Sequence, residues 1–234
     1  MKIIKASEIE RTHNWRILIY GKPGNGKTYL TNYLSGKTLI LDMDHSSKTI
    51  AGNENIDIIQ FDRTHPSDFM NEFLTELPEL TKEYDNLVID NITSWQSDWF
   101  IEQGRKSKNG ITNELQQYNM WTNYYLRVLT TIYNQPINIF VTAWESTQDL
   151  TLETGQIITQ YIPDIRKQVL SQTLGLTDIV GRIQVNPKTG GHGILLEGSD
   201  GLYAKNRLDN RKVIEASKLF EFGDITNEVT RLPN

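Results

Sequence analysis

The chain has 234 residues, which suits one large domain or one domain with a small appendage. It contains no cysteine, which excludes a disulfide framework, a cysteine-ligated zinc site, a thiolate nucleophile and an iron–sulfur cluster. The net charge of −5 argues against a protein whose whole surface coats nucleic acid, but it allows a local basic site. No apolar run approaches the roughly 18 residues of a membrane span, and the first ten residues show no signal-peptide core. We therefore expect a cytoplasmic protein without a membrane partner.

Strand-like and helix-like stretches alternate along the chain, which predicts an α/β fold with a mainly parallel sheet flanked by helices. The apolar runs predict strands at 15–20, 38–41, 56–61, 87–90 and 137–142. The helical patterns predict helices at 28–34, 67–77, 94–103 and 113–133.

The last third of the chain has a different pattern. Residues 150–161 predict a hairpin around a glycine-containing turn, and residues 178–204 predict an antiparallel meander added to the parallel sheet. One further helix is expected near 213–220. These patterns divide the chain into an N-terminal arm (1–14), a core (15–208) and a C-terminal helix with a tail (209–234).

A glycine-rich segment between the first strand and the first helix matches the pattern GxxxxGK[ST]. Glycines let backbone N–H groups turn inward around phosphates, and the helix that follows adds the positive end of its dipole. In this pattern the lysine reaches the β- and γ-phosphates and the threonine hydroxyl ligates Mg²⁺. The flanking strand and helix disfavour a chance glycine-rich turn. We therefore predict that ATP and Mg²⁺ bind at Gly21, Pro23, Gly24, Asn25, Gly26, Lys27, Thr28 and Tyr29.

Asp90 directly follows the apolar run Leu87–Ile89. A carboxylate at the end of a buried strand beside a phosphate loop is suited to hold Mg²⁺, so we predict that Thr28 and Asp90 form the metal site. The alternative is a structural one, in which Asp90 caps the helix that begins near Ile92.

The segment Leu41–His45, with the sequence LDMDH, ends the strand after the phosphate loop and resembles the sequence IDAEH of the RecA-like ATPases. In those ATPases the carboxylate that activates the attacking water stands here, so the resemblance implies that Asp44 is catalytic. Aspartate is one methylene shorter than glutamate, which is expected to slow hydrolysis or to require a shifted water. Asp42 is the competing candidate, and two solvated loop carboxylates are the third interpretation.

The segment Ala204–Arg207, with the sequence AKNR, resembles the VKNK element of RecA. The two basic residues of that element reach across a subunit interface to the γ-phosphate of the neighbour. The resemblance therefore implies that Lys205 and Arg207 are catalytic in trans and that the protein is a homo-oligomer, either a ring or a filament. The alternative is a solvated basic edge strand.

Two loops of RecA-like cores face a central axis and hold DNA. The corresponding segments here are Gly104–Asn113, which contains Arg105, Lys106 and Lys108, and Ser146–Arg166 with the adjoining Lys167. The resemblance implies that these five basic residues bind DNA, although most clusters of Lys and Arg are solvated surface.

The chain departs from the RecA pattern at the end of the strand 137–142. RecA-like proteins usually have a glutamine or histidine there that senses the γ-phosphate, whereas this chain has Ala143 and Trp144. Thr142 or Glu145 could substitute, or the coupling between ATP and DNA is weak. The tryptophans and tyrosines at helical spacing (Trp95, Trp99, Trp121, Tyr124 and Tyr125) are expected in the core rather than on a base-stacking surface.

Residues of about 15–207 together resemble the RecA-like P-loop proteins of phages of Gram-positive bacteria, which are described as single-strand annealing proteins. This resemblance implies a slow ATPase in the infected host cell that binds single-stranded DNA and promotes annealing or strand pairing. A single-strand-binding protein is a possible partner. Two other classes stay open: a helicase or helicase-loader-like motor, and a nucleotide-dependent switch that binds proteins.

Overall fold

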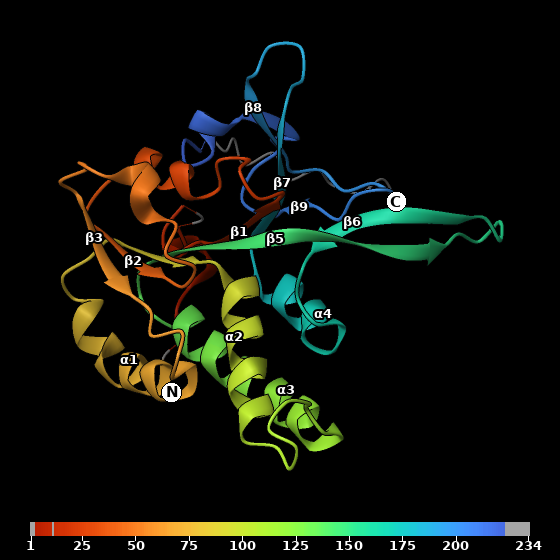
Figure 1. Cartoon of the computed structure of the whole chain (residues 1–234). Helices are drawn as coiled ribbons and strands as arrows, with labels where there is room; N and C mark the ends of the chain where they lie inside the picture. Colours follow the sequence, from red (N-terminus) through yellow and green to blue (C-terminus); the bar gives the residue numbers. More distant parts are fainter. Residues whose placement is uncertain (1–2, 11, 223–234) are drawn as a thin grey trace.

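The fold is an α/β sheet covered on both faces, and the computed structural model describes residues 3–10 and 12–222 of it (Figure 1). The main sheet has the strand order β10-β8-β7-β1-β5-β4-β2-β3, while β6 pairs with β5 and β9 pairs with β7. The strands are β1 (Arg16–Gly21), β2 (Thr38–Asp42), β3 (Ile56–Gln60), β4 (Asn86–Asp90), β5 (Asn138–Thr151), β6 (Ile157–Pro163), β7 (Ile179–Val185), β8 (His192–Leu195), β9 (Lys205–Asn206) and β10 (Val213–Glu215).

The six strands from β7 to β3 are parallel, and β6, β8, β9 and β10 join antiparallel. The predicted class, a mainly parallel sheet with antiparallel C-terminal strands, is therefore confirmed. Its helices are α1 (Pro66–Leu80), α2 (Ile92–Arg105), α3 (Leu115–Tyr133) and α4 (Lys167–Leu176). Four short 3₁₀ helices complete the described elements: η1 (Ala6–Glu8), η2 (Thr28–Tyr33), η3 (Ser47–Ile50) and η4 (Ala216–Lys218).

The central strands are apolar on both faces because each face packs against its own core cluster. In β1, Leu18 and Tyr20 belong to the cluster under α1–α4, whereas Ile17 and Ile19 belong to the cluster under η2, η3 and the C-terminal segment. This alternation follows from the two-residue period of a strand. The sheet is thereby fixed between two layers, and the ends of its parallel strands are held in register.

The predicted aromatic core is confirmed between α2 and α3. Trp95, Trp99, Trp121 and Tyr125 are buried, and Tyr124 is half-buried against them. The rings of Trp95 and Trp121 have their centroids 4.8 Å apart. These aromatic side chains stabilise the helical layer and present no stacking surface to solvent.

The residues after the phosphate loop form the 3₁₀ helix η2 rather than the expected α-helix. The amide of Leu34 bonds to the carbonyl of Thr31, three residues earlier. The Thr31 hydroxyl also bonds to the Thr28 carbonyl at 2.8 Å. Such side-chain bonds compete with the α-helical ladder, which explains the tighter turn.

The predicted hairpin is present, but its first arm is a continuation of the core strand β5. Beyond Trp144 the strand leaves the sheet, and the hairpin of β5 and β6 projects from the molecule (Figure 1). The apolar run ends where the strand reaches solvent, so the pattern suggested two separate strands. Helix α4 was missed, although Val169, Leu170, Thr173 and Leu174 form a buried stripe along it.

The prediction of a helix at 213–220 is wrong. Residues 213–215 form strand β10, in which Ile214 pairs with Ile194 of β8, and a 3₁₀ turn follows. β-branched residues favour a strand where a sheet edge is available to pair with. The segment then returns to the core, where Leu219 is fully buried and the Phe220 ring stacks on Trp15 at 5.4 Å. The expected tail from residue 223 on lies outside the described residues.

The described part of the N-terminal arm carries the short helix η1 and is exposed along residues 3–10 and 12–14. None of the helices described is both long and apolar enough to cross a bilayer.

Replacing Leu219 by alanine is expected to lower the free energy of unfolding by about 3 kcal/mol, because a fully buried leucine leaves a cavity when it is truncated. Urea denaturation followed by far-UV circular dichroism measures this change. The control is Leu176→Ala, since Leu176 is 47% exposed and should change stability by less than about 1 kcal/mol. Equal effects of the two substitutions would contradict the docking of the C-terminal segment.

Candidate functional site

The loop between β1 and η2 has the backbone that a phosphate-binding loop needs. Gly24 and Gly26 both have φ near +83°, a region that residues with a side chain rarely adopt. The Asn25 amide side chain donates to the Ile183 carbonyl at 3.3 Å, which anchors the loop to β7. The loop is thus built in advance by its own glycines and by the neighbouring strand.

Lys27 is buried inside this loop, with 7% of its surface exposed. Its ammonium donates to the carbonyls of Gly21 at 2.9 Å and Lys22 at 3.0 Å. Burial lowers the pKa of Lys27, while the nearby carboxylates of Asp90 and Asp44 act in the opposite direction. An anionic phosphate is a stronger partner for this ammonium than two carbonyls, so the lysine is well placed to bind one.

Asp90 ends β4 and is 1% exposed. Burial raises its pKa to about 6, the hydroxyls of Thr142 and Thr28 lower it, and the negative charges of Asp44 and Asp42 raise it further. Thr142 donates to one carboxylate oxygen, and the Ser46 hydroxyl lies 3.4 Å from the other. The carboxylate therefore has hydroxyl partners but no ion-pair partner in direct contact within the described residues.

The oxygens around Asp90 fit a magnesium ion. The Thr28 hydroxyl lies 3.1 Å from that of Ser46, which in turn reaches Asp90. Among residues 3–10 and 12–222, no group of three or more His, Cys, Asp or Glu side chains is arranged as a metal cage. That is expected of an ion held by one carboxylate, one hydroxyl and substrate phosphates, because Mg²⁺ keeps several waters and rarely uses an all-protein cage.

Asp42 and Asp44 differ in surroundings. The two carboxylate oxygens of Asp42 accept the backbone N–H groups of Ser46 at 3.0 Å and Ser47 at 3.2 Å, and the residue is fully buried. Asp42 thus holds the turn that begins η3. Asp44 is half-buried, accepts a hydrogen bond from the Asn91 side chain and lines the cleft beside the phosphate loop.

These residues surround a cleft of about 280 Å³ at the carboxyl end of the parallel strands. Parallel sheets bind ligands at this edge, because the loops after neighbouring strands meet there. The residues that line the cleft come from the phosphate loop, η2, the segments after β2 and β4, and the middle of β5: Pro23, Gly24, Gly26, Lys27, Thr28, Tyr29, Asp44, Ser46, Thr49, Asp90, Asn91 and Trp144.

Sequence reasoning missed Ser46 and Asn91. Ser46 links Thr28 to Asp90, and Asn91 contacts Asp44. The only signal was their position, since each lies within two residues of a predicted site residue. Hydroxyl and amide side chains are too common in loops for that position alone to identify them.

The part of β5 that borders the cleft, residues 142–145, offers no free polar side chain in place of a γ-phosphate sensor. Thr142 is fully buried and donates to Asp90. Glu145 pairs with Arg182 at 3.0 Å, and the Arg182 guanidinium lies 3.7 Å from the centre of the Tyr161 ring. Trp144, by contrast, lines the cleft directly.

Lys205 and Arg207 are not brought to the cleft of their own chain. Strand β9 pairs with Ile179 and Val180 at the amino end of β7, whereas the phosphate loop contacts Ile183 further along. The Lys205 ammonium donates to the Gly175 carbonyl at 3.3 Å, and burial lowers its pKa to about 8. Arg207 is exposed, and its role in trans stays a prediction.

The basic residues of the first predicted DNA loop lie at the end of α2. Arg105 is the last residue of that helix, and both it and Lys108 are exposed. Lys106 forms an ion pair with the buried Glu102 at 3.0 Å. The loop lies at the far end of α2 and α3, well separated from the tip of the β5–β6 hairpin (Figure 1).

The second predicted DNA segment is tied to the helices at its base. The Arg166 guanidinium lies 4.5 Å from the centre of the Tyr118 ring and 4.8 Å from that of Phe100. Arg166 is therefore engaged in the packing of α2 and α3. Lys167 begins α4 and is exposed.

The parallel sheet, the glycine-rich loop with its buried lysine and the carboxylate after β4 together define a P-loop protein of the α/β class. A family model described as an AAA domain matches residues 13–208, and the chain belongs to this family.

None of the curated proteins matches the chain. Among solved structures, the crystal structure of the RadB recombinase is 15% identical and covers 78% of this chain and 80% of its own, with a TM-score of 0.46. A KaiC-like protein from the archaeon Pyrococcus horikoshii OT3 is 13% identical and covers 78% of each chain, with a TM-score of 0.46.

Replacing Asp90 by asparagine is expected to stabilise the nucleotide-free protein at neutral pH. The folded-state pKa of about 6 lies above the ordinary aspartate pKa of 3.8, so the folded state binds the proton more tightly than the unfolded state. Wild type therefore loses stability as pH rises from about 4 to about 6, and ionised Asp90 destabilises it above that range. At pH 7.5 the variant should unfold with a free energy roughly 1–3 kcal/mol higher than wild type.

The measurement is urea denaturation of both proteins between pH 4 and 7.5 without nucleotide or Mg²⁺. The difference between them should shrink toward pH 4. Glu153→Gln, an exposed carboxylate in the β5–β6 turn, is the control that should show no such pH-dependent gain. A gain for Asp90→Asn that is constant across this pH range would refute the explanation by burial.

Proposed function

We propose that this chain is a RecA-like ATPase that binds ATP with Mg²⁺, hydrolyses it slowly and uses the bound nucleotide to control binding of single-stranded DNA. The activity it serves is annealing or strand pairing in phage recombination. The observation that carries the proposal is the cleft in which Lys27, Thr28, Asp44 and Asp90 converge.

The phosphate loop binds the triphosphate through its backbone N–H groups and through Lys27. The Lys27 ammonium exchanges its two loop carbonyls for phosphate oxygens. Thr28 and Asp90 would hold Mg²⁺, which neutralises charge on the phosphates when it is bound. Burial raises the pKa of Asp90, and a divalent cation beside this carboxylate would favour its ionised form.

Asp44 is the residue that orients and activates the attacking water in this proposal. It lines the cleft, whereas the carboxylate of Asp42 is used to hold the backbone of Ser46 and Ser47. The Asn91 side chain donates to one Asp44 oxygen and the Ser46 backbone N–H donates to the other at 3.1 Å, which fixes the orientation of the carboxylate beside the cleft. The short aspartate side chain supports slow rather than fast turnover.

Coupling between nucleotide and DNA runs along β5 in this proposal. Trp144 lines the cleft, and from Glu145 the same strand continues into the projecting β5–β6 hairpin. A shift at Trp144 on nucleotide binding would therefore move the hairpin and its base. The exposed Arg105 and Lys108 supply the local positive charge that an acidic protein needs to hold a phosphate backbone.

Lys205 and Arg207 support self-association. They lie at the amino end of β7, away from their own cleft, so they serve a γ-phosphate only if it belongs to a neighbouring subunit. The exposed arm at residues 3–10 carries Ile3, Ile4 and Ile9, which are available for contact with a second copy. A single-strand-binding protein is the further partner that this function would involve.

Binding of labelled single-stranded DNA should require ATP and an intact phosphate loop. Wild type with ATP–Mg²⁺ is expected to bind at least tenfold more tightly than wild type without nucleotide. Lys27→Ala should lose this gain, because the lysine is the main positive charge in the cleft. Fluorescence anisotropy at moderate salt measures both affinities.

The DNA-contact control is the double substitution Arg105→Gln and Lys108→Gln, which leaves the Lys106–Glu102 pair intact. It should weaken DNA binding and reduce the salt dependence of the affinity, with ATP binding unchanged. Replacing the exposed Lys82 and Lys188 instead should have little effect. DNA binding that depends neither on nucleotide nor on Lys27 would refute the proposed coupling. Strand displacement with fast DNA-stimulated ATP turnover would indicate a motor.

Replacing Asp44 by asparagine is expected to reduce ATP turnover by about 10²- to 10⁴-fold, the range that a positioned general base contributes. ATP affinity should change by less than about threefold. Asp44→Glu should retain turnover, because the longer carboxylate reaches the same water. Phosphate release under saturating ATP measures the rate.

Asp42→Asn is the matched comparison. It should mainly cost stability, by about 1–2 kcal/mol, because one oxygen that accepts a backbone N–H becomes a donor. If Asp44→Asn hydrolyses ATP at the wild-type rate, Asp44 is not catalytic and the protein-binding switch becomes the better hypothesis.

A further inference from the structure

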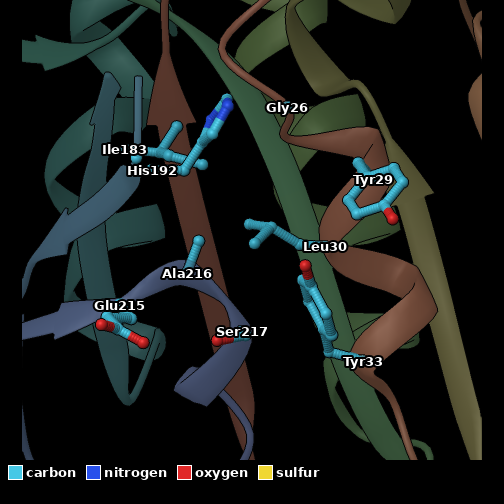
Figure 2. Close-up of a pocket in the computed structure, with 10 residues that line it drawn as sticks. Gly26, Tyr29, Leu30, Tyr33, Ile183, His192, Glu215, Ala216 and Ser217 are labelled. Atoms are coloured by element: carbon cyan, nitrogen blue, oxygen red, sulfur yellow. The ribbon is translucent and has the colours of Figure 1, made fainter. Parts of the chain in front are cut away.

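A second cavity, of about 460 Å³, adjoins the phosphate cleft (Figure 2). Gly26 and Tyr29 line both the cleft and the cavity, so the two meet at the end of the phosphate loop. The lining of the second cavity comes from η2, β7, β8 and the C-terminal segment: Gly26, Tyr29, Leu30, Tyr33, Ile183, Gly191, His192, Glu215, Ala216 and Ser217.

One wall of this cavity is aromatic and its floor is apolar. The rings of Tyr29 and Tyr33 meet edge to face with centroids 5.8 Å apart, and they are 49% and 40% exposed. Leu30 and Ile183, which are buried, lie beneath them. The cavity is thus lined by two tyrosine rings that are partly exposed to solvent.

The opposite wall is formed by residues 215–217, which lie beyond the segment 13–208 that matches the AAA domain. This wall is firmly attached. Glu215 pairs with Gly193 of β8, and the Arg211 guanidinium donates to the carbonyls of Lys218 at 2.7 Å and Leu219 at 3.2 Å. The C-terminal segment therefore shapes the cavity as a fixed part of the fold.

His192 connects the cavity to the phosphate loop. Its Nδ1 lies 3.0 Å from the Asn25 carbonyl, and its ring stands close to Gly26. In Figure 2, His192 and Ile183 stand on the opposite side of the cavity from Tyr29 and Tyr33. A flat ligand between these two sides would lie among the tyrosine and histidine side chains, with the phosphate loop at one end.

The charge of the lining indicates what kind of ligand fits. Among residues 3–10 and 12–222, one carboxylate, that of Glu215, lines the cavity, and no lysine or arginine does. A second phosphate or another anion is therefore disfavoured here. A neutral planar heterocycle matches both the aromatic wall and the volume, which lies in the range of small-molecule sites.

We propose that the nucleobase of the bound nucleoside triphosphate occupies this cavity, and that the C-terminal segment 215–217 is one wall of the nucleotide site. This inference rests on the proposed function, because it requires a triphosphate in the adjoining cleft. The base packs against Tyr33 on one side and against residues 215–217 on the other. Purines bind better than pyrimidines, because a larger ring system buries more area against the same walls.

The test compares ATP, UTP and inorganic tripolyphosphate, each with Mg²⁺, by isothermal titration calorimetry. Wild type should bind ATP more tightly than UTP, and both more tightly than tripolyphosphate. Tyr33→Ala should weaken ATP about tenfold, as expected when one base–aromatic contact is lost, and leave tripolyphosphate unchanged within twofold. Ser217→Phe, which fills the cavity from the opposite wall, should have the same selective effect.

Tyr84→Ala is the matched control, because Tyr84 is a half-buried tyrosine bonded to Asp57 in β3, at the other edge of the sheet. It should change none of the three affinities, and thermal unfolding of every variant checks that the fold is retained. The inference is overturned if wild type binds ATP no better than tripolyphosphate, or if the cavity variants leave ATP affinity unchanged or weaken both ligands equally. If wild type binds none of the three, the proposed function itself fails.

Discussion

The structure depends on how it accommodates two charged groups, Lys27 and Asp90, that are both nearly removed from solvent. Burial of charges is costly unless partners are supplied, and here the partners are backbone carbonyls for the ammonium and hydroxyls for the carboxylate. These partners do not fully offset the cost of burying the two charges, because the pKa of Lys27 is lowered and that of Asp90 is raised. In the proposed function, a bound phosphate would stabilise the charged lysine and a bound cation would stabilise the charged aspartate.

The sheet explains why these groups meet. β1, β2, β4 and β5 run parallel and end at one edge, so the residues just past each strand converge although they are far apart in the chain. Both faces of the sheet are buried, which holds the strand ends in place. The rigidity of the cleft therefore originates in the two apolar layers and not in the polar residues themselves.

The C-terminal segment is an integral part of the fold and not only a tail. It covers Trp15 through Phe220, adds an antiparallel strand to β8 and forms a wall of the cavity beside the phosphate loop. The C-terminal segment therefore contributes both to the stability of the core cluster under η2 and η3 and to the shape of the proposed base pocket. A nucleotide bound there would tighten the segment that completes the core.

Spacing along the chain was enough to predict the α/β class and a P-loop protein, because both depend on short-range patterns of glycine, polar and apolar residues. The role of Asp90 in metal binding stays a prediction. Only the folded backbone showed that Asp42 is fully buried under the turn at Ser46 and Ser47, whereas Asp44 lines the cleft, and the catalytic role of Asp44 stays a proposal. Strand β10 was misread as a helix, because its conformation is imposed by pairing with β8. The cavity bordered by Tyr33 and residues 215–217 could not be predicted from the sequence. Its two walls are about 180 residues apart along the chain, and only the tertiary fold brings them face to face.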